Sequence, residues 1–225
     1  IKQLKMINLW HVFQQMAHLG VDSLPIISLT LLFAGAVMTL QITDVLITYG
    51  AQSTVGGLMA VAMGRELGPI LVGVVLAGRV GAAITAEIGT MKVTEQIDAL
   101  RVMAVDPVGY LVVPRVVACM VMVPILAFYG VVIGIAGGYF VATAIKGLAP
   151  STYLDSIQMF STISDFTLGL IKSSVFGAVI ALVGAYKGME TKMGAEAVGF
   201  STTSSVVTSI ILVFVLNYFL STLLY

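Results

Sequence analysis

Four ionisable residues interrupt one apolar stretch of the sequence and are its first candidates for chemistry. Arg65 and Glu66 open the run RELGP, and Arg79 and Glu87 follow further along the same stretch. Ionisable groups inside a long apolar segment are costly, so they usually mark a pathway, a cavity or a structural ion pair. Arg79 and Glu87 lie about 80° apart around a helix, which favours a structural pair. For Arg65 and Glu66, a polar opening and an ion pair stay equally open.

The sequence holds no motif through which it would catalyse a reaction or bind ATP alone. It has no HExxH zinc motif, no nucleophile elbow and no GxxxxGK[ST] phosphate loop. Cys119 is its only cysteine, which excludes an internal disulfide. His11 and His18 have no accompanying third ligand, so solvated side chains are favoured over a metal site. We therefore expect no enzyme and no cofactor, and a partner chain or an ion gradient must supply energy for any uphill transport.

Composition places these residues in a membrane protein. Of the 225 residues, 59% are hydrophobic and 10% are charged, and the mean hydropathy is +1.06. Soluble domains carry roughly a quarter charged residues, so this chain cannot build a polar coat and must face lipid. Eleven Lys and Arg balance eleven Asp and Glu, which leaves no strongly basic surface for nucleic acid.

Residues 1–22 predict an amphipathic interfacial helix, and residues 23–225 predict a single membrane domain. In the opening stretch, apolar side chains that include Trp10 and Phe13 recur at spacings of three to four residues, a pattern typical of a helix lying among lipid headgroups. The uncharged run from Ser23 to Thr43 is long enough for one crossing.

The rest of the chain predicts further crossings, one of them broken. Between residues 54 and 91, Gly68-Pro69 predicts a short piece to Gly64 and then a longer helix. Uncharged or nearly uncharged runs at 116–145, 166–186 and from Ser204 to the end predict three more crossings, with a loop at 187–203. The fold class is thus an all-α integral membrane protein with about five transmembrane helices, including the broken segment. In the run 116–145, Gly130, Gly134 and Gly138 recur every four residues, which lets another helix approach closely.

Residues 92–106 form the only charge-dense stretch and predict a short amphipathic helix outside the hydrocarbon core. Ile97 and Leu100 share one helical face, and the charged residues take the other. Thr94 is placed to cap its start, and Asp106-Pro107 discourages continuation. Such a helix can be surface decoration or a docking element for a cytoplasmic partner, and the sequence alone leaves both open.

The distribution of basic residues predicts a cytoplasmic amino terminus. With that orientation, the cytoplasmic side receives most of the cations, and the opposite side receives chiefly Lys146, with Lys172 nearby. The cytoplasmic set is Lys2, Lys5, Lys92, Arg101, Arg115, Lys187 and Lys192. The 92–106 helix then also faces the cytoplasm, and the carboxyl terminus faces away.

The run from Arg65 to Ala118 closely resembles the MlaE-type permeases, the family concerned with maintaining lipid asymmetry. Its most specific segments are EIGTMKVTEQIDAL and MAVDP, and IKSSVFG, GAEAVGFSTTSSVV and NYFLS add support. The similarity covers nearly the whole chain and is weakest at 1–20 and 146–165. It implies a homodimeric permease in a bacterial inner membrane, working with a cytoplasmic ABC ATPase dimer that binds ATP. An MCE-domain protein on the far side and a phospholipid cargo are also implied.

The resemblance also implies functional positions. Residues 92–106 correspond to the coupling helix, which makes Glu95, Gln96, Asp98 and Arg101 the expected ATPase contacts. A lipid cavity formed by the first crossing and the segment after it maps onto this sequence as Met38, Gln41, Ile42, Val45, Leu46 and Tyr49, with Arg65 and Glu66 near the headgroup. Without the resemblance, ordinary helix packing is the favoured reading of the apolar members.

Two other functions stay open from the sequence. The ionisable residues of the broken segment suit an ion-coupled secondary transporter or a channel, although no second RELGP-like break appears in the carboxyl half. A scaffold that only holds partner proteins in the membrane is the third possibility. The sequence decides neither the lipid species nor the direction of transport, the kind of organism or whether residues precede Ile1.

Overall fold

The protein is a bundle of long helices. The computed structural model describes residues 9–224, and within them there is no strand. In this described part of the chain, five helical segments are long and apolar enough to cross a membrane: Val12–Thr48, Gln52–Val93, Val108–Ile145, Ile163–Met189 and Ala195–Leu224. Many large apolar side chains face outward along these segments, as expected where the solvent is lipid. The predicted all-α membrane fold is confirmed.

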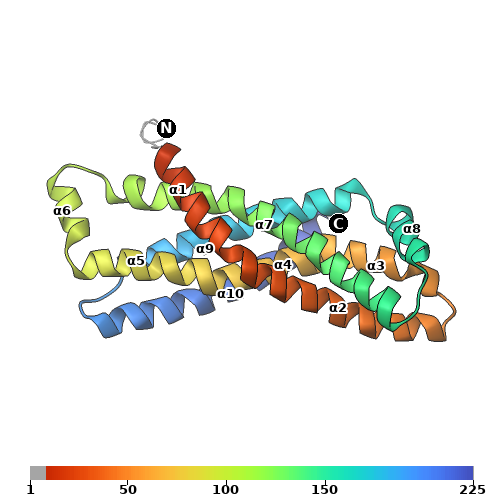
Figure 1. The fold of residues 1–225 in the computed structure, drawn as a ribbon. Helices are drawn as coiled ribbons and strands as arrows, with labels where there is room; N and C mark the ends of the chain where they lie inside the picture. The colour runs from red at the N-terminus through yellow and green to blue at the C-terminus, as the bar shows by residue number, and fades with distance from the viewer. Residues whose placement is uncertain (1–8, 225) are drawn as a thin grey trace.

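The helical elements follow one another with short connections (Figure 1). In chain order they are α1 (Leu9–Gly20), η2 (Val21–Ser23), α2 (Leu24–Thr48), η3 (Gln52–Thr54), α3 (Val55–Ala62), η4 (Met63–Leu67), α4 (Gly68–Leu76), η5 (Ala77–Gly81), α5 (Ala82–Val93), α6 (Gln96–Val102), η6 (Val108–Val112), α7 (Val113–Phe140), η7 (Val141–Ile145), α8 (Pro150–Phe160), α9 (Ile163–Met189) and α10 (Ala195–Leu224). The elements η4, η5, η6 and η7 are π-helical turns, in which the helix widens locally.

Small residues set the packing of α2 against α7. A Cβ built on Gly35 would overlap the carbonyl oxygen of Gly134, and one built on Gly137 would overlap that of Leu32. Because no side chain separates the two backbones, the helices approach closely, as glycine repeats allow in membranes. The close approach predicted from the spacing of Gly130, Gly134 and Gly138 is confirmed, and the partner is α2.

The second crossing is continuous, so the predicted break is wrong. The helix runs from Val55 to Val93 through η4 and η5 without interruption. Pro69 stands at the start of α4, directly after the π-helical turn η4. The wider turn accommodates the proline, which a regular helix would accept only with a kink. The last crossing also begins earlier than expected, because α10 starts at Ala195 and the predicted loop 187–203 shrinks to a few residues.

The two ends of the bundle differ. Helix α6 and the α9–α10 connection lie at the end where α1 begins, and α8 lies at the opposite end with the α2–α3 connection (Figure 1). The amino-terminal part and the 92–106 region are therefore on the same side, as the charge distribution predicted.

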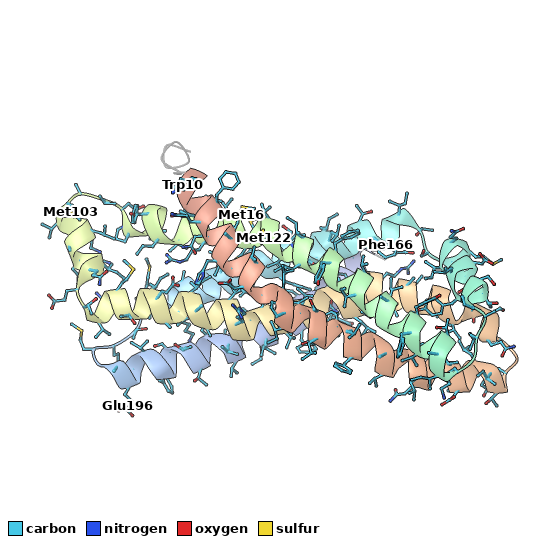
Figure 2. All side chains as sticks on the ribbon, in the orientation of Figure 1. Trp10, Met16, Met103, Met122, Phe166 and Glu196 are labelled. Atoms are coloured by element: carbon cyan, nitrogen blue, oxygen red, sulfur yellow. The ribbon has the colours of Figure 1, made fainter. Side chains whose placement is uncertain are left out.

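Helix α1 lies obliquely across α7 and leads into α2 through η2. Gly20 packs directly on Met122 of α7, while Val12 and Leu19 are buried. Trp10 is 68% exposed and Phe13 is 60% exposed, and Trp10 projects away from the bundle (Figure 2). Residues 1–8 of the predicted interfacial helix lie outside the described residues. From Leu9 onward the segment is a helix with an outward aromatic face.

Candidate functional site

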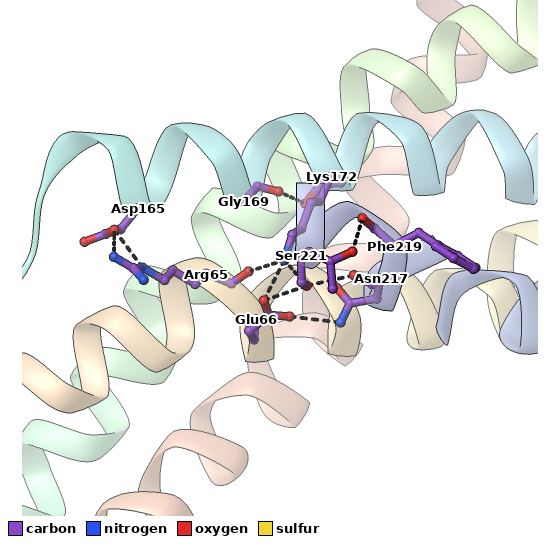
Figure 3. Close-up of polar contacts among 10 residues, drawn as sticks. Arg65, Glu66, Asp165, Gly169, Lys172, Asn217, Phe219 and Ser221 are labelled. Atoms are coloured by element: carbon purple, nitrogen blue, oxygen red, sulfur yellow. Dashed lines mark hydrogen bonds and ion pairs between the residues drawn. The ribbon is translucent and has the colours of Figure 1, made fainter. Parts of the chain in front are cut away.

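A network of polar side chains lies inside the apolar bundle, where η4, α9 and α10 meet (Figure 3). We call Glu66, Lys172, Asn217 and Ser221 the polar cluster. Lys172 has a fully buried side chain, and its Nζ lies 2.7 Å from Glu66 Oε1. Lys172 also donates to Ser221 Oγ at 2.8 Å, and Asn217 Nδ2 donates to Glu66 Oε2 at 2.9 Å. An ion pair with neutral hydrogen-bonding partners is the form in which buried charges are tolerated.

The helix geometry of η4 explains why the lysine lies here. Pro69 has no N–H to donate to the carbonyl of Arg65, four residues earlier. That carbonyl accepts a hydrogen bond from Lys172 Nζ at 3.1 Å. The proline therefore leaves a backbone acceptor that the buried ammonium group satisfies. The π-helical turn and its proline thus help to build the cluster, which agrees with the frequent occurrence of π-bulges at functional sites.

A second ion pair lies next to the polar cluster. Arg65 Nε and Nη2 both lie 2.7 Å from Asp165 Oδ1. Asp165 also caps α9, because its Oδ2 accepts from the backbone N–H of Thr162 at 2.9 Å. One carboxylate thus fixes both the start of α9 and the arginine of η4. Arg65 keeps 41% of its side chain exposed and Glu66 keeps 39%, so neither ion pair encloses both of its partners.

The residues predicted to line a lipid cavity on α2 separate into two faces. Gln41, Val45 and Tyr49 follow one another at four-residue spacing and are exposed. The other three are half-buried, Met38 and Ile42 against the main core and Leu46 against a smaller apolar cluster near α8. The hydrogen bonds that place Arg65 and Glu66 run to α9 and α10. The structure therefore joins Arg65 and Glu66 to the carboxyl half of the bundle, and the α2 residues form a separate outward stripe.

The predicted coupling helix is shorter than 92–106, because α6 spans only Gln96–Val102. The expected Thr94 cap is wrong, since the Thr94 hydroxyl donates to Thr90 O at 2.8 Å. Glu95 is the N-cap instead, with a left-handed φ of 60°. Ile97 is 1% exposed and anchors the helix to the bundle.

The charged side chains of α6 are partly or largely exposed at the end of the bundle. Asp98 lies between two cations, with Oδ1 2.9 Å from Arg101 Nη1 and Oδ2 3.4 Å from Lys92 Nζ. Glu95 and Gln96 are exposed, and Gln96 Nε2 donates to Thr94 Oγ1 at 3.1 Å. The four predicted contact residues thus lie together on an accessible helix end, with Met103 projecting beside them (Figure 2).

The predicted pair of Arg79 with Glu87 is wrong. Glu87 Oε2 lies 2.8 Å from Arg115 Nη2, on α7. Glu87 Oε1 is also 4.0 Å from His18 Nε2, and His18 Nδ1 lies 3.0 Å from Asp22. Arg79 is exposed on η5. Arg115 is only 8% exposed and takes the place of Arg79 as the partner of Glu87. A helical wheel of one segment cannot predict this pair, because Arg115 lies on a different helix.

Sequence reasoning missed four members of these networks: Asp165, Lys172 as a partner of Glu66, Asn217 and Ser221. Lys172 stood out as the only charge within its crossing but had no assigned partner. Asn217 and Ser221 are four residues apart in an otherwise apolar run, which places them on one helical face. That spacing was the signal that could have identified them.

Comparison with known proteins identifies the family. The Permease MlaE family model matches residues 12–223. A probable ABC transporter permease protein of Synechocystis is 45% identical over 219 residues, covering 97% of this chain and 83% of the relative. A probable ABC transporter permease protein of Rickettsia typhi is 41% identical over 214 residues, covering 95% of this chain and 83% of the relative.

A plant relative extends the comparison. The chloroplastic protein TRIGALACTOSYLDIACYLGLYCEROL 1 of Arabidopsis thaliana is 37% identical over 211 residues, which cover 94% of this chain and 60% of the relative. The matches span every crossing and both networks described above. The chain therefore belongs to the MlaE family of ABC transporter permeases and is a membrane permease subunit.

Proposed function

We propose that this permease is the membrane half of an ABC-type phospholipid transport system, driven by a separate cytoplasmic ATPase. The observation that carries the proposal is α6, a short charged helix held at the end of an apolar bundle whose sequence has no phosphate loop. The plant relative, whose name contains that of a glycerolipid, supports a lipid cargo. In this proposal two copies of the chain form the permease, and an MCE-domain protein receives or delivers lipid at the α8 end.

The lipid site of the proposal combines the α2 stripe with the residues of η4. Val45 and Tyr49 offer apolar surface, and Gln41 offers a polar group along the same exposed face. The half-exposed guanidinium of Arg65 suits a phosphate, and the half-exposed carboxylate of Glu66 suits a cationic headgroup. Since the two sets lie on different parts of one protomer, a dimer in which α2 of one copy faces η4 of the other would bring them together.

Helix α6 is the proposed lever between ATPase and permease. Ile97 ties it to the bundle. Glu95, Gln96 and Arg101 are exposed and Asp98 is half-exposed, so all four can enter a groove on the ATPase. Movement of that groove would then be transmitted through α5 directly into η4 and the polar cluster, since α5 belongs to the same continuous helix. We place α6 and the amino terminus in the cytoplasm, because Lys92, Arg101, Lys187 and Lys192 gather at that end.

Copurification tests the proposal. The chain is extracted from membranes with a mild detergent, and its companions are identified by mass spectrometry. We expect a cytoplasmic ABC ATPase and bound phospholipid. A chain that emerges alone, free of phospholipid and without effect on the ATPase would contradict the proposal. Ion flux through liposomes that hold only this chain would instead favour an ion-coupled transporter, and companions without lipid transport would favour a scaffold.

A further inference from the structure

Arg79 is a charged residue for which the described part of the chain, residues 9–224, supplies no partner. Within residues 9–224 its guanidinium takes part in no hydrogen bond or ion pair. The eight residues that precede this range contain no Asp or Glu. The neighbouring carboxylates are engaged elsewhere, Glu87 by Arg115 at 2.8 Å and Asp22 by His18 at 3.0 Å. An arginine at a membrane protein's surface that lacks a counter-ion within the fold is free to take one from outside.

A pocket holds this arginine against α1. It has a volume of about 220 Å³ and is lined by His18, Leu19, Arg79, Val80 and Ala83. The lining thus combines three apolar side chains with a guanidinium and an imidazole. This composition suits a ligand that combines a phosphate group with hydrocarbon.

The pocket lies at the depth in the membrane where lipid headgroups are found. Helix α2 begins at Leu24 and has 25 residues, about 37 Å, enough to cross a hydrocarbon layer of roughly 30 Å. His18 and Leu19 precede α2, so the pocket lies at the edge of that layer, on the α6 side. The exposed Trp10 and Phe13 of α1 mark the same interfacial zone.

Arg79 lies in the π-helical turn η5, on the surface of the bundle. Gly78 and Arg79 are both exposed, and a Cβ built on Gly78 would meet no atom within 4 Å. The guanidinium is therefore open to the surrounding bilayer.

We infer that Arg79, with His18 beside it, binds the phosphate of a phospholipid in the leaflet on the α6 side. This site is distinct from the proposed lipid path at Arg65 and Glu66, which α9 and α10 surround. It does not depend on transport, so its failure would leave the proposed function standing. The bound lipid would hold α1 against η5.

Photocrosslinking tests the site with the full chain in nanodiscs of phosphatidylcholine. The probe is phosphatidylglycerol with a diazirine in its headgroup, and labelled peptides are located by mass spectrometry. We expect labelling at α1 and η5. Arg79→Gln should lower it about tenfold, since a charge-assisted phosphate contact is lost. Ala83→Phe should lower it as well, by filling the pocket with the arginine still present.

Controls separate the alternatives. Lys192→Gln removes a cation at the same end of the bundle and should leave labelling unchanged. A galactolipid carrying the same diazirine should not label, and excess inorganic phosphate should not compete, because the acyl chains contribute to binding. Unchanged labelling in Arg79→Gln would overturn the inference. Equal labelling by the galactolipid, or full competition by inorganic phosphate, would also overturn it. If Arg79→Gln instead abolished the dimer, as measured by light scattering, the counter-ion of Arg79 would belong to a second copy of the chain, and the inference would fail.

Discussion

The two halves of the Glu66–Lys172 ion pair are not equivalent, and this asymmetry gives a sharp prediction. Lys172 is 0% exposed, whereas Glu66 keeps 39% of its side chain exposed. Glu66→Gln preserves shape but leaves the buried ammonium without its counter-ion. Lys172→Met fills the same space with an apolar chain and leaves a partly exposed carboxylate. We predict that Glu66→Gln is the more destabilising change.

The magnitudes follow from what each variant leaves behind. In Glu66→Gln the buried cation loses its carboxylate partner and retains neutral acceptors such as Arg65 O at 3.1 Å and Ser221 Oγ at 2.8 Å. Removing one partner of a buried ion pair costs about 3–5 kcal/mol. In Lys172→Met, Glu66 still accepts from Asn217 at 2.9 Å and from Ser221 at 2.8 Å. The variant removes the contacts of Lys172 Nζ with Glu66, Ser221 and the carbonyl of Arg65, but it leaves no buried charge without a partner. The unsatisfied carbonyl then costs about 1–3 kcal/mol.

Cys119 provides the assay. It is the only cysteine in the sequence and is 2% exposed, so a thiol-reactive dye reports its exposure on unfolding. Unfolding in mixed micelles with increasing sodium dodecyl sulfate would give the free energy of unfolding for the wild type, both variants and the double variant. The double variant removes both charges and should be more stable than Glu66→Gln.

Equal losses in the two single variants would refute the asymmetry. A double variant as unstable as the sum of both singles would show that the two side chains do not interact.

Three further predictions concern packing, alkaline stability and the α6 turn. Gly35→Ala should lower the free energy of unfolding by about 1–3 kcal/mol, because the added methyl group pushes α2 away from Gly134. Gly78→Ala places its methyl group in open space and should be neutral or stabilising. Thermal unfolding in detergent compares the two variants. Burial raises the pKa of Tyr153 from 10.0 to about 12, so the unfolded state loses its proton first and stability should fall as pH rises through this window. Tyr153→Phe should reduce that slope in unfolding curves across the same pH range. Glu95→Gly should relieve a left-handed φ that costs about 1–2 kcal/mol, so the stability of the protein should be kept or raised. The same variant should lower ATP-dependent transport, because a proposed ATPase contact is lost. Unchanged transport would mean that this carboxylate has no coupling role.

The sequence predicted the elements of the fold better than their interactions. The uncharged run after Ser23 predicted α2, and the glycines of the third crossing predicted a close approach to α7 without naming the partner helix, because hydrophobicity and helical spacing are local properties. The start of α10 was missed because small and hydroxylated residues between Ala195 and Thr203 suggest a loop in water but are common in membrane helices.

The networks were predictable only in part because their members are far apart in the sequence. Glu66 and Lys172 are separated by 106 positions, and no periodicity links them. Arg79 and Glu87 shared a helix and were paired for that reason, but Arg115 on α7 lies closer to Glu87. The proline of RELGP was predicted to break the second crossing, and that prediction is wrong. Its actual effect is to free a carbonyl for Lys172 rather than to break the helix.

The central claim is that the ATPase drives the permease through α6. Its most direct test is ATP-dependent phospholipid transfer from proteoliposomes that contain the chain with its ATPase. Asp98→Arg reverses a charge on α6 and disturbs an exposed ion pair with Arg101 and a part-buried one with Lys92. Ion pairs near the surface are worth about 0–1 kcal/mol each, so folding and copurification with the ATPase should persist. Glu196→Arg makes the same reversal on α10, away from α6 (Figure 2), and serves as the control. The account predicts wild-type transfer with Glu196→Arg and a loss of at least about tenfold, roughly 1.4 kcal/mol, with Asp98→Arg. Full transfer by Asp98→Arg, or wild-type transfer without ATP, would contradict it.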